Sequence, residues 1–221
     1  GILNMGLFLK VGALFIVGVT GLSSEGWALP LIMTGLIGLV LIYTTLGGMM
    51  SVIMTDYIQF VVLSLGLLTV VGISITHLGW TSITETVITV MGDGGVNPVS
   101  SQSDFGWTYI LWMVMTAGLV SCAIWPTSVA RALAMKSEDQ VKVQYKLASI
   151  TFMIRFLIPN FLGVCAWVYV TNKPALRTVF MGGGAGTMNT LLAMPVYLGQ
   201  VIPTGVLGLV TAAMVAAFMS T

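Results

Sequence analysis

Long runs without a charged residue constrain this chain more than any other feature. No Asp, Glu, Lys or Arg occurs between Glu25 and Asp56, and none occurs between Asp56 and Glu85. A helix needs roughly 20 mostly apolar residues to cross the hydrocarbon core of a bilayer, and both runs exceed that length. Soluble domains carry about 25% charged residues, whereas this chain carries 7%. The sequence therefore predicts an all-α, polytopic transmembrane helix bundle.

Polar turns and glycine pairs divide the apolar sequence into six segments. The turn at Ser23-Ser24-Glu25-Gly26 ends the first, and Gly47-Gly48 separates the second from the third. We treat residues 1–221 as a single transmembrane domain and expect it to be a fragment of a longer protein. It begins without Met and stops inside an apolar run. The predicted spans are residues about 3–22, 27–45, 52–78, 106–123, 147–170 and 204–221, the last of them truncated.

The connecting segments predict the orientation of the bundle. The link between the fourth and fifth spans holds Arg131, Lys136, Lys142 and Lys146, and cytoplasmic loops carry an excess of Lys and Arg. This face is therefore predicted to be cytoplasmic, with Asp56 near it, in a multi-pass protein of the plasma membrane. Residues 80–105 and 172–188 are polar and belong outside the bilayer, and the apolar stretch 190–201 is expected at the interface.

Several classes of function have no support in the composition. The net charge of +1 gives no basis for binding nucleic acid. Cys122 and Cys165 lie in apolar segments, where cysteine behaves as a small buried hydrophobe. His77 is the single histidine, so neither a transition-metal site nor a cofactor is predicted. An enzyme would need paired carboxylates or a nucleophile with its base, and this chain is not predicted to be one.

Two cations fall inside predicted spans. Arg155 lies about nine residues into the fifth span, or roughly 13 Å at 1.5 Å per residue, where an arginine costs about 2.5–3.5 kcal/mol even on the lowest scales. It is either a ligand for a polar or anionic solute or a member of a structural pair. Lys10 lies near the middle of the first span and either snorkels to the interface or lines the same cavity. Both cations together would favour a small carboxylate.

Oxygen-bearing residues at two spans suggest a cation site. Asp56 is either the N-cap of the third span or a carboxylate on a cation path, because hard cations prefer oxygen ligands. Ser220 and Thr221 are either helix–helix contacts or ligands. With the carbonyl of Ala217, one turn earlier, their hydroxyls would form part of a shell for a monovalent cation.

Prolines mark two further positions. Pro126 and Pro159 remove backbone donors within or beside apolar spans, and such breaks are tolerated at membrane depth where they face protein or a water-filled cavity. Each is either a plain kink or part of a transport site near the bilayer midplane.

Beyond these local features, the chain resembles the sodium:solute symporter family, which includes the sodium/proline and sodium/glucose cotransporters. Its strongest match is Tyr43-Thr44-Thr45-Leu46-Gly47-Gly48, followed by Thr55-Asp56 and Gln59 at the family's spacing. Further matches, in order along the chain, are residues 131–136, 203–205, 208–209 and 216–221.

This resemblance implies the middle section of a LeuT-type inverted-repeat fold. In the family, sodium is held between a broken helix and the helix that ends in Ser-Thr, which implies a sodium-binding role for Ala217, Ser220 and Thr221. Asp56 matches an aspartate associated with sodium binding or exit. Arg155 falls where sugar-transporting members place a substrate-binding lysine. The Trp125-Pro126 pair falls where proline-transporting members have Gln-Pro. The chain departs from both patterns, so neither sugar nor proline carries over.

We therefore predict a sodium-coupled symporter of a small organic solute, possibly anionic, that works by alternating access. Its partners would be the solute, the sodium ion as coupling ion and the lipid bilayer. The predicted solute-binding residues are Arg155, Trp125, Pro126 and Lys10. A transporter-like membrane sensor or a channel component is the alternative.

Overall fold

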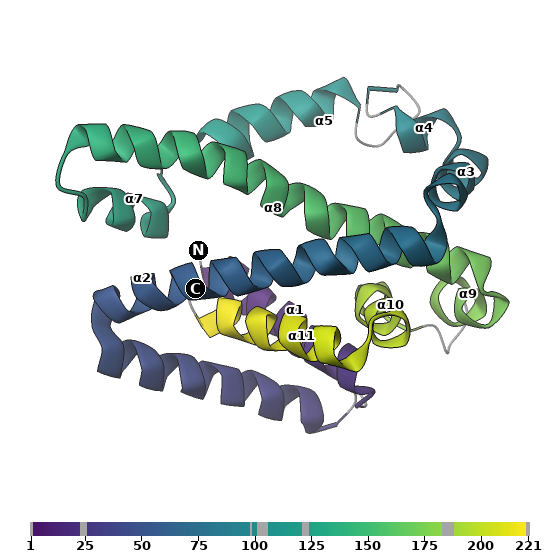
Figure 1. Ribbon diagram of the computed structural model, residues 1–221, viewed down its shortest axis with the longest axis horizontal. Helices are drawn as coiled ribbons and strands as arrows, with labels where there is room; N and C mark the ends of the chain where they lie inside the picture. The colour runs from purple at the N-terminus through teal and green to yellow at the C-terminus, as the bar shows by residue number, and fades with distance from the viewer. Residues whose placement is uncertain are drawn as a thin grey trace. The chain divides into compact units, whose positions relative to one another are not determined.

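The computed structural model describes residues 2–22, 26–97, 99–100, 106–120, 124–182 and 188–219. Within these ranges every regular element is helical, which confirms the all-α prediction (Figure 1). The chain forms two compact units, residues 1–79 with 158–221, and residues 80–157. Helix α8 (Glu138–Asn172) belongs to both and passes from one unit to the other beside Pro159.

The longest helix of the first unit is α2 (Ala28–Leu78), which follows α1 (Ile2–Thr20). Gly48 interrupts α2 with φ 58° and ψ −173°, and a positive φ is a conformation that glycine adopts without steric cost. The break expected at Gly47-Gly48 is therefore present. Figure 1 shows the chain reversing direction there, so the two halves of α2 run in opposite directions.

Among the residues that the structure describes, three stretches of helix are long and apolar enough to cross a membrane, namely Ala28–Gly48, Ile53–Leu78 and Glu138–Asn172. Large apolar side chains point outward from them, as at Leu31 and Leu46, which are 74% and 84% exposed. Outward-facing apolar surface of this extent suits contact with lipid. These helices overlap three of the six predicted spans, and the division into six remains a prediction.

Helix α11 (Thr204–Met219) packs mainly against the second half of α2. A Cβ atom added to Gly66 would lie 3.0 Å from Cγ2 of Val210, so the two backbones approach closely. Val70 and Ala213 are buried in the same unit. Small residues at the contact permit such close packing of apolar helices. In Figure 1, α11 runs antiparallel to this half of α2.

A short helix, α10 (Ala193–Val201), lies across α1 and is preceded by the 3-10 turn η2 (Thr190–Leu192). A Cβ on Gly18 would lie 2.6 Å from Cβ of Pro195, so glycine is required for this contact. Helix α9 (Pro174–Met181) lies in the segment that the sequence marked only as polar. Its residue Phe180 joins a buried cluster with Leu14, Val170 and Leu192, which ties α8, α9 and η2 to α1.

The second unit contains shorter elements before α8. They are α3 (Trp80–Met91), α4 (Asp93–Val96), α5 (Trp107–Trp112), the π-helix η1 (Met113–Val120) and α7 (Pro126–Leu133). An eight-residue π-helix is unusual, since such turns mostly occur singly inside α-helices. Together α5 and η1 occupy the region of the predicted fourth span.

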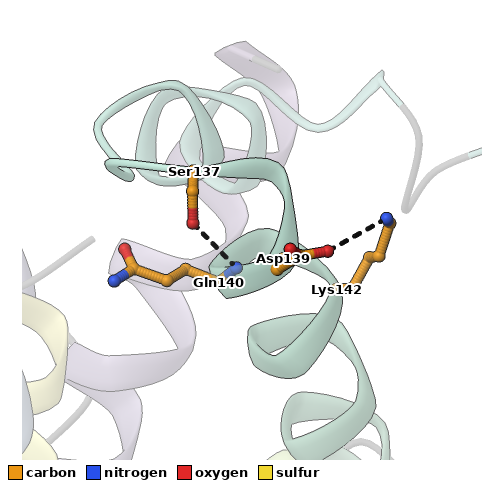
Figure 2. A network of polar contacts seen from close by, with 4 residues as sticks. All are labelled: Ser137, Asp139, Gln140 and Lys142. Carbon is orange, nitrogen blue, oxygen red and sulfur yellow. Dashed lines mark hydrogen bonds and ion pairs between the residues drawn. The ribbon is translucent and has the colours of Figure 1, made fainter.

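A capping arrangement starts α8 (Figure 2). The Gln140 N–H donates to Oγ of Ser137 at 3.4 Å, as Figure 2 shows. Oε1 of Gln140 accepts from the Lys136 N–H at 3.3 Å. This is a variant of the capping box, in which two exposed backbone donors at a helix start are satisfied by side chains. The helix therefore begins nine residues before the predicted fifth span, which extended about 147–170. The predicted span corresponds to the apolar part of a longer helix.

Candidate sodium and solute sites

The antiparallel pair of α2 and α11 determines which predicted sodium residues can meet. Gly66 and Val210 face each other near its middle. Nine residues back along α2 lies Tyr57, and nine residues forward along α11 lies Met219. At 1.5 Å per residue both are about 14 Å from the contact, in the same direction. Asp56 and the last described turn of α11 therefore lie at the same end of the pair.

Asp56 is half-buried, and its Oδ1 atom is shielded from solvent. It lies inside continuous helix, well after the break at Gly48. An N-cap residue has non-helical geometry, so the alternative that Asp56 caps a helix start is wrong.

The other predicted sodium ligands lie at the end of α11. Ala217 belongs to its last helical turns, and its side chain is outside the described part. Ser220 and Thr221 lie outside the described residues, directly after Met219 in the chain. Their role as ligands remains a prediction.

The predicted solute residues are divided between the units. Arg155, Trp125 and Pro126 belong to the second unit, whereas Lys10 belongs to the first. Trp125 is the extended, half-buried N-cap of α7, and Pro126 is the first helical residue. Proline suits that position because its fixed φ is helical and it has no N–H to satisfy. Pro126 therefore starts a helix, whereas Pro159 lies within α8.

The structure describes the side chain of Lys10 and only the backbone of Arg155. Arg155 is helical in α8, four residues before Pro159, and its side chain lies outside the described part. Lys10 is exposed on α1, a position that permits snorkelling along apolar surface. A common cavity for the two cations remains a prediction.

A polar cluster that the sequence analysis missed lies in the first unit. Tyr169 is 5% exposed and Tyr197 is fully buried, with ring centroids 5.1 Å apart. The Tyr169 hydroxyl donates to Oε1 of Gln200 at 3.0 Å and accepts from Nζ of Lys173, which also lies 4.2 Å from the centre of the Tyr169 ring. The His77 ring is 6.4 Å away.

One local signal for this cluster was available. Tyr169 and Lys173 are four residues apart, a spacing at which side chains on a helix meet, although Lys173 itself is the extended residue between α8 and α9. Their contact with Gln200, 31 residues further on, depends on tertiary packing. Elsewhere in the described part, no group of three His, Cys, Asp or Glu gathers as a metal site.

Comparison with known proteins decides the family. The model of the sodium:solute symporter family matches residues 6–221, nearly the whole chain. The chain belongs to the sodium:solute symporter family. This symporter-family chain, with its three membrane-length helices, is part of an integral membrane protein.

Two human relatives are transporters by name. The chain is 24% identical over 213 residues to sodium/myo-inositol cotransporter 2 of Homo sapiens, covering 87% of this chain and 31% of the relative. It is 27% identical over 240 residues to the Homo sapiens sodium/myo-inositol cotransporter, covering 95% of this chain and 32% of the relative. This symporter-family chain thus spans about a third of the length of the curated relatives it matches. No solved structure matches it.

Proposed function

We propose that the full-length protein is a sodium-coupled symporter of the plasma membrane that moves a small organic solute by alternating access. The Ala217 carbonyl and the Ser220 and Thr221 hydroxyls supply part of the sodium shell. Asp56 supplies negative charge near it. The observation that supports this arrangement best is the antiparallel register of α2 and α11, by which Asp56 lies at the same end of the pair as the last described turn of α11.

The chemistry of sodium agrees with these groups. Sodium is a hard cation and prefers oxygen ligands, and carbonyl and hydroxyl oxygens supply them without extra charge. A carboxylate nearby lowers the cost of bringing a cation into apolar surroundings, since charges interact more strongly at low dielectric. In the proposed cycle, sodium binds first and raises the affinity for the solute. Solute must then raise the affinity for sodium by the same factor.

For the solute, an anionic compound is the first candidate. Arg155, near the middle of α8 and four residues before Pro159, provides a cation at membrane depth, and Trp125, Pro126 and Lys10 complete the proposed contacts. Intramembrane cations are rare and commonly mark substrate pathways. A polyol is the second candidate, because both relatives are named as myo-inositol cotransporters.

The experiment is radiolabelled uptake by the full-length protein in proteoliposomes, with sodium or choline outside. We expect accumulation against a gradient with sodium and little uptake with choline. Small carboxylates and myo-inositol should be compared as solutes in parallel. Equal uptake with sodium and with choline would contradict the proposal, because transport would then not depend on sodium. Sodium or solute binding without saturable accumulation would instead support the alternative, a membrane sensor or channel component.

A further inference from the structure

The cluster around Tyr169 joins two helices that are far apart in the sequence. We call Tyr169, Lys173 and Gln200 the tyrosine bridge. Lys173, the residue after α8, donates to the hydroxyl of Tyr169 on α8, which donates to Gln200 on α10, so the three side chains form one directed chain of hydrogen bonds. The ammonium group of Lys173 strengthens it, because hydrogen bonds to charged groups are stronger than neutral ones and successive bonds polarise one another.

The bridge is anchored in buried structure on both sides. Tyr169 is nearly buried on α8, and Tyr197, one turn before Gln200 on α10, is fully buried against its ring. On α1, Pro195 of α10 fits against Gly18 with no room for a Cβ atom. Helix α10 is therefore fixed between α1 and α8, and the tyrosine bridge supplies its directional polar contact with α8.

Helix α10 leads directly into α11. It ends at Val201, and α11 begins at Thr204, with the buried Ile202 and the exposed Pro203 between them. The Ile202 N–H donates to the Leu198 carbonyl, and the Leu207 N–H donates to the Pro203 carbonyl, both at 2.9 Å. Proline also fixes φ at this connection. A shift of α10 is therefore passed to the first turn of α11.

From this connection we infer that Tyr169, Lys173 and Gln200 are positioning residues for sodium binding. They hold α10, and through it they hold α11, whose far end carries the sodium ligands; this inference rests on the proposed function. A site that is held in its binding geometry loses less freedom when the ion binds. Loosening the bridge therefore weakens sodium binding without removing any ligand.

The test uses two substitutions at one position in the full-length transporter. Gln200→Leu removes the acceptor for Tyr169, so the sodium concentration for half-maximal uptake should rise by about three- to tenfold, in line with the loss of one hydrogen bond between neutral groups. Gln200→Glu keeps an acceptor and adds attraction to Lys173, so it should retain or lower the wild-type value. Tyr169→Phe keeps the buried ring and should behave like Gln200→Leu. In all three, maximal uptake per transporter at the membrane should change less than sodium affinity.

Thr76→Val is the matched control. Its hydroxyl lies on the nearby end of α2 and bonds to carbonyls of its own helix at Gly72 and Ile73, so its loss should leave sodium affinity unchanged. A second measurement is the sodium-dependent rise in melting temperature of purified protein, which reports binding even when transport is lost. Gln200→Leu should require more sodium for the same rise.

The outcomes separate this inference from the proposed function. If neither the uptake nor the melting temperature of the wild-type protein depends on sodium, the proposed function and the positioning role are both overturned. Wild-type protein that depends on sodium, together with unchanged sodium affinity in Gln200→Leu and Tyr169→Phe, overturns the positioning role alone. Sodium affinity in Gln200→Glu as low as in Gln200→Leu also overturns the positioning role, because that role requires an acceptor oxygen at residue 200.

Discussion

At one end of the α2–α11 pair, polar side chains are bonded to one another across helices. The tyrosine bridge lies there, near His77 at the end of α2. At the other end, α2 carries the half-buried carboxylate of Asp56, and α11 leads into Ser220 and Thr221. Between the two ends the contact is apolar, through Gly66, Val210 and their neighbours.

The difference between these ends lies in their charge. The tyrosine bridge includes a cation whose ammonium group is already held by a hydroxyl and an aromatic ring. The Asp56 end has a negative charge beside a helix whose ligands are predicted to be neutral oxygens. We propose that an ion entering from solution is bound at the second end, and the side chains of the first end are joined by hydrogen bonds. The predictions below test this division between an ion-binding end and a structural end.

The largest effect is expected at the end of α11. Replacing Ser220 and Thr221 together by Ala removes two of the predicted sodium ligands, so the sodium requirement of uptake should rise more than tenfold, equivalent to more than about 1.4 kcal/mol. Sodium titrations of uptake by the full-length protein measure it. The control is Thr211→Ala, since this hydroxyl donates to the Leu207 carbonyl of its own helix. An unchanged sodium dependence in the double variant would remove both residues from the site.

Substitutions in the middle of the α2–α11 contact should change the stability of the folded protein. At Gly66 a valine would push against Val210, whose side chain is 3.0 Å from the position of a Cβ, and overpacking costs about 1–3 kcal/mol. Gly66→Val should therefore lower the melting temperature of the purified protein, and Val210→Ala should partly restore it. Gly72→Val is matched on the same helix and has open space around its Cβ position. Equal destabilisation at both glycines would contradict the close approach of α2 and α11.

A smaller change is expected from the Asp56 carboxylate. Asp56→Asn keeps the shape and removes the charge, so the sodium requirement should rise by about fivefold, because a nearby charge contributes on the order of 1 kcal/mol when partly screened. Sodium titration at saturating solute measures this effect. Asp93→Asn, at the exposed start of α4, serves as the control. If both aspartates gave the same small change, Asp56 would have no special place at this end of the pair.

The sequence predicted these regions unequally, for a physical reason. The two halves of α2 and the apolar part of α8 could be predicted from the length of their apolar runs, because a helix must be that long to cross the hydrocarbon core. The break in α2 could be predicted at Gly48, because few residues other than glycine adopt a positive φ. Which face of α11 meets α2 is not evident from polarity, since lipid and protein interior are both apolar. Close approach at Gly66 depends on small residues, and Gly is frequent throughout the chain.

The candidate site shows the same limit. Asp56 could be selected from the sequence because a charge in an apolar run is costly and therefore conspicuous. Gln200 and Tyr169 are uncharged and individually ordinary, and what joins them is a contact across 31 positions. Apolar composition placed the fifth span at about 147–170, whereas the helix that contains it begins at Glu138, where Ser137 and Gln140 supply the capping contact.

The smallest effect on sodium affinity is expected at that helix start, which belongs to neither end of the pair. Ser137→Ala removes the oxygen that accepts from the Gln140 N–H, and loss of such a cap costs about 1 kcal/mol. Hydrogen exchange at the amides of Gln140 and Val141 should accelerate by about fivefold, while sodium affinity stays at the wild-type value. Lys142→Ala should change exchange less, because its pair with Asp139 is exposed on both sides and such pairs contribute little. A shift in sodium affinity in Ser137→Ala would show that sodium binding also depends on residues outside the α2–α11 pair, and the division between its two ends would then be incomplete.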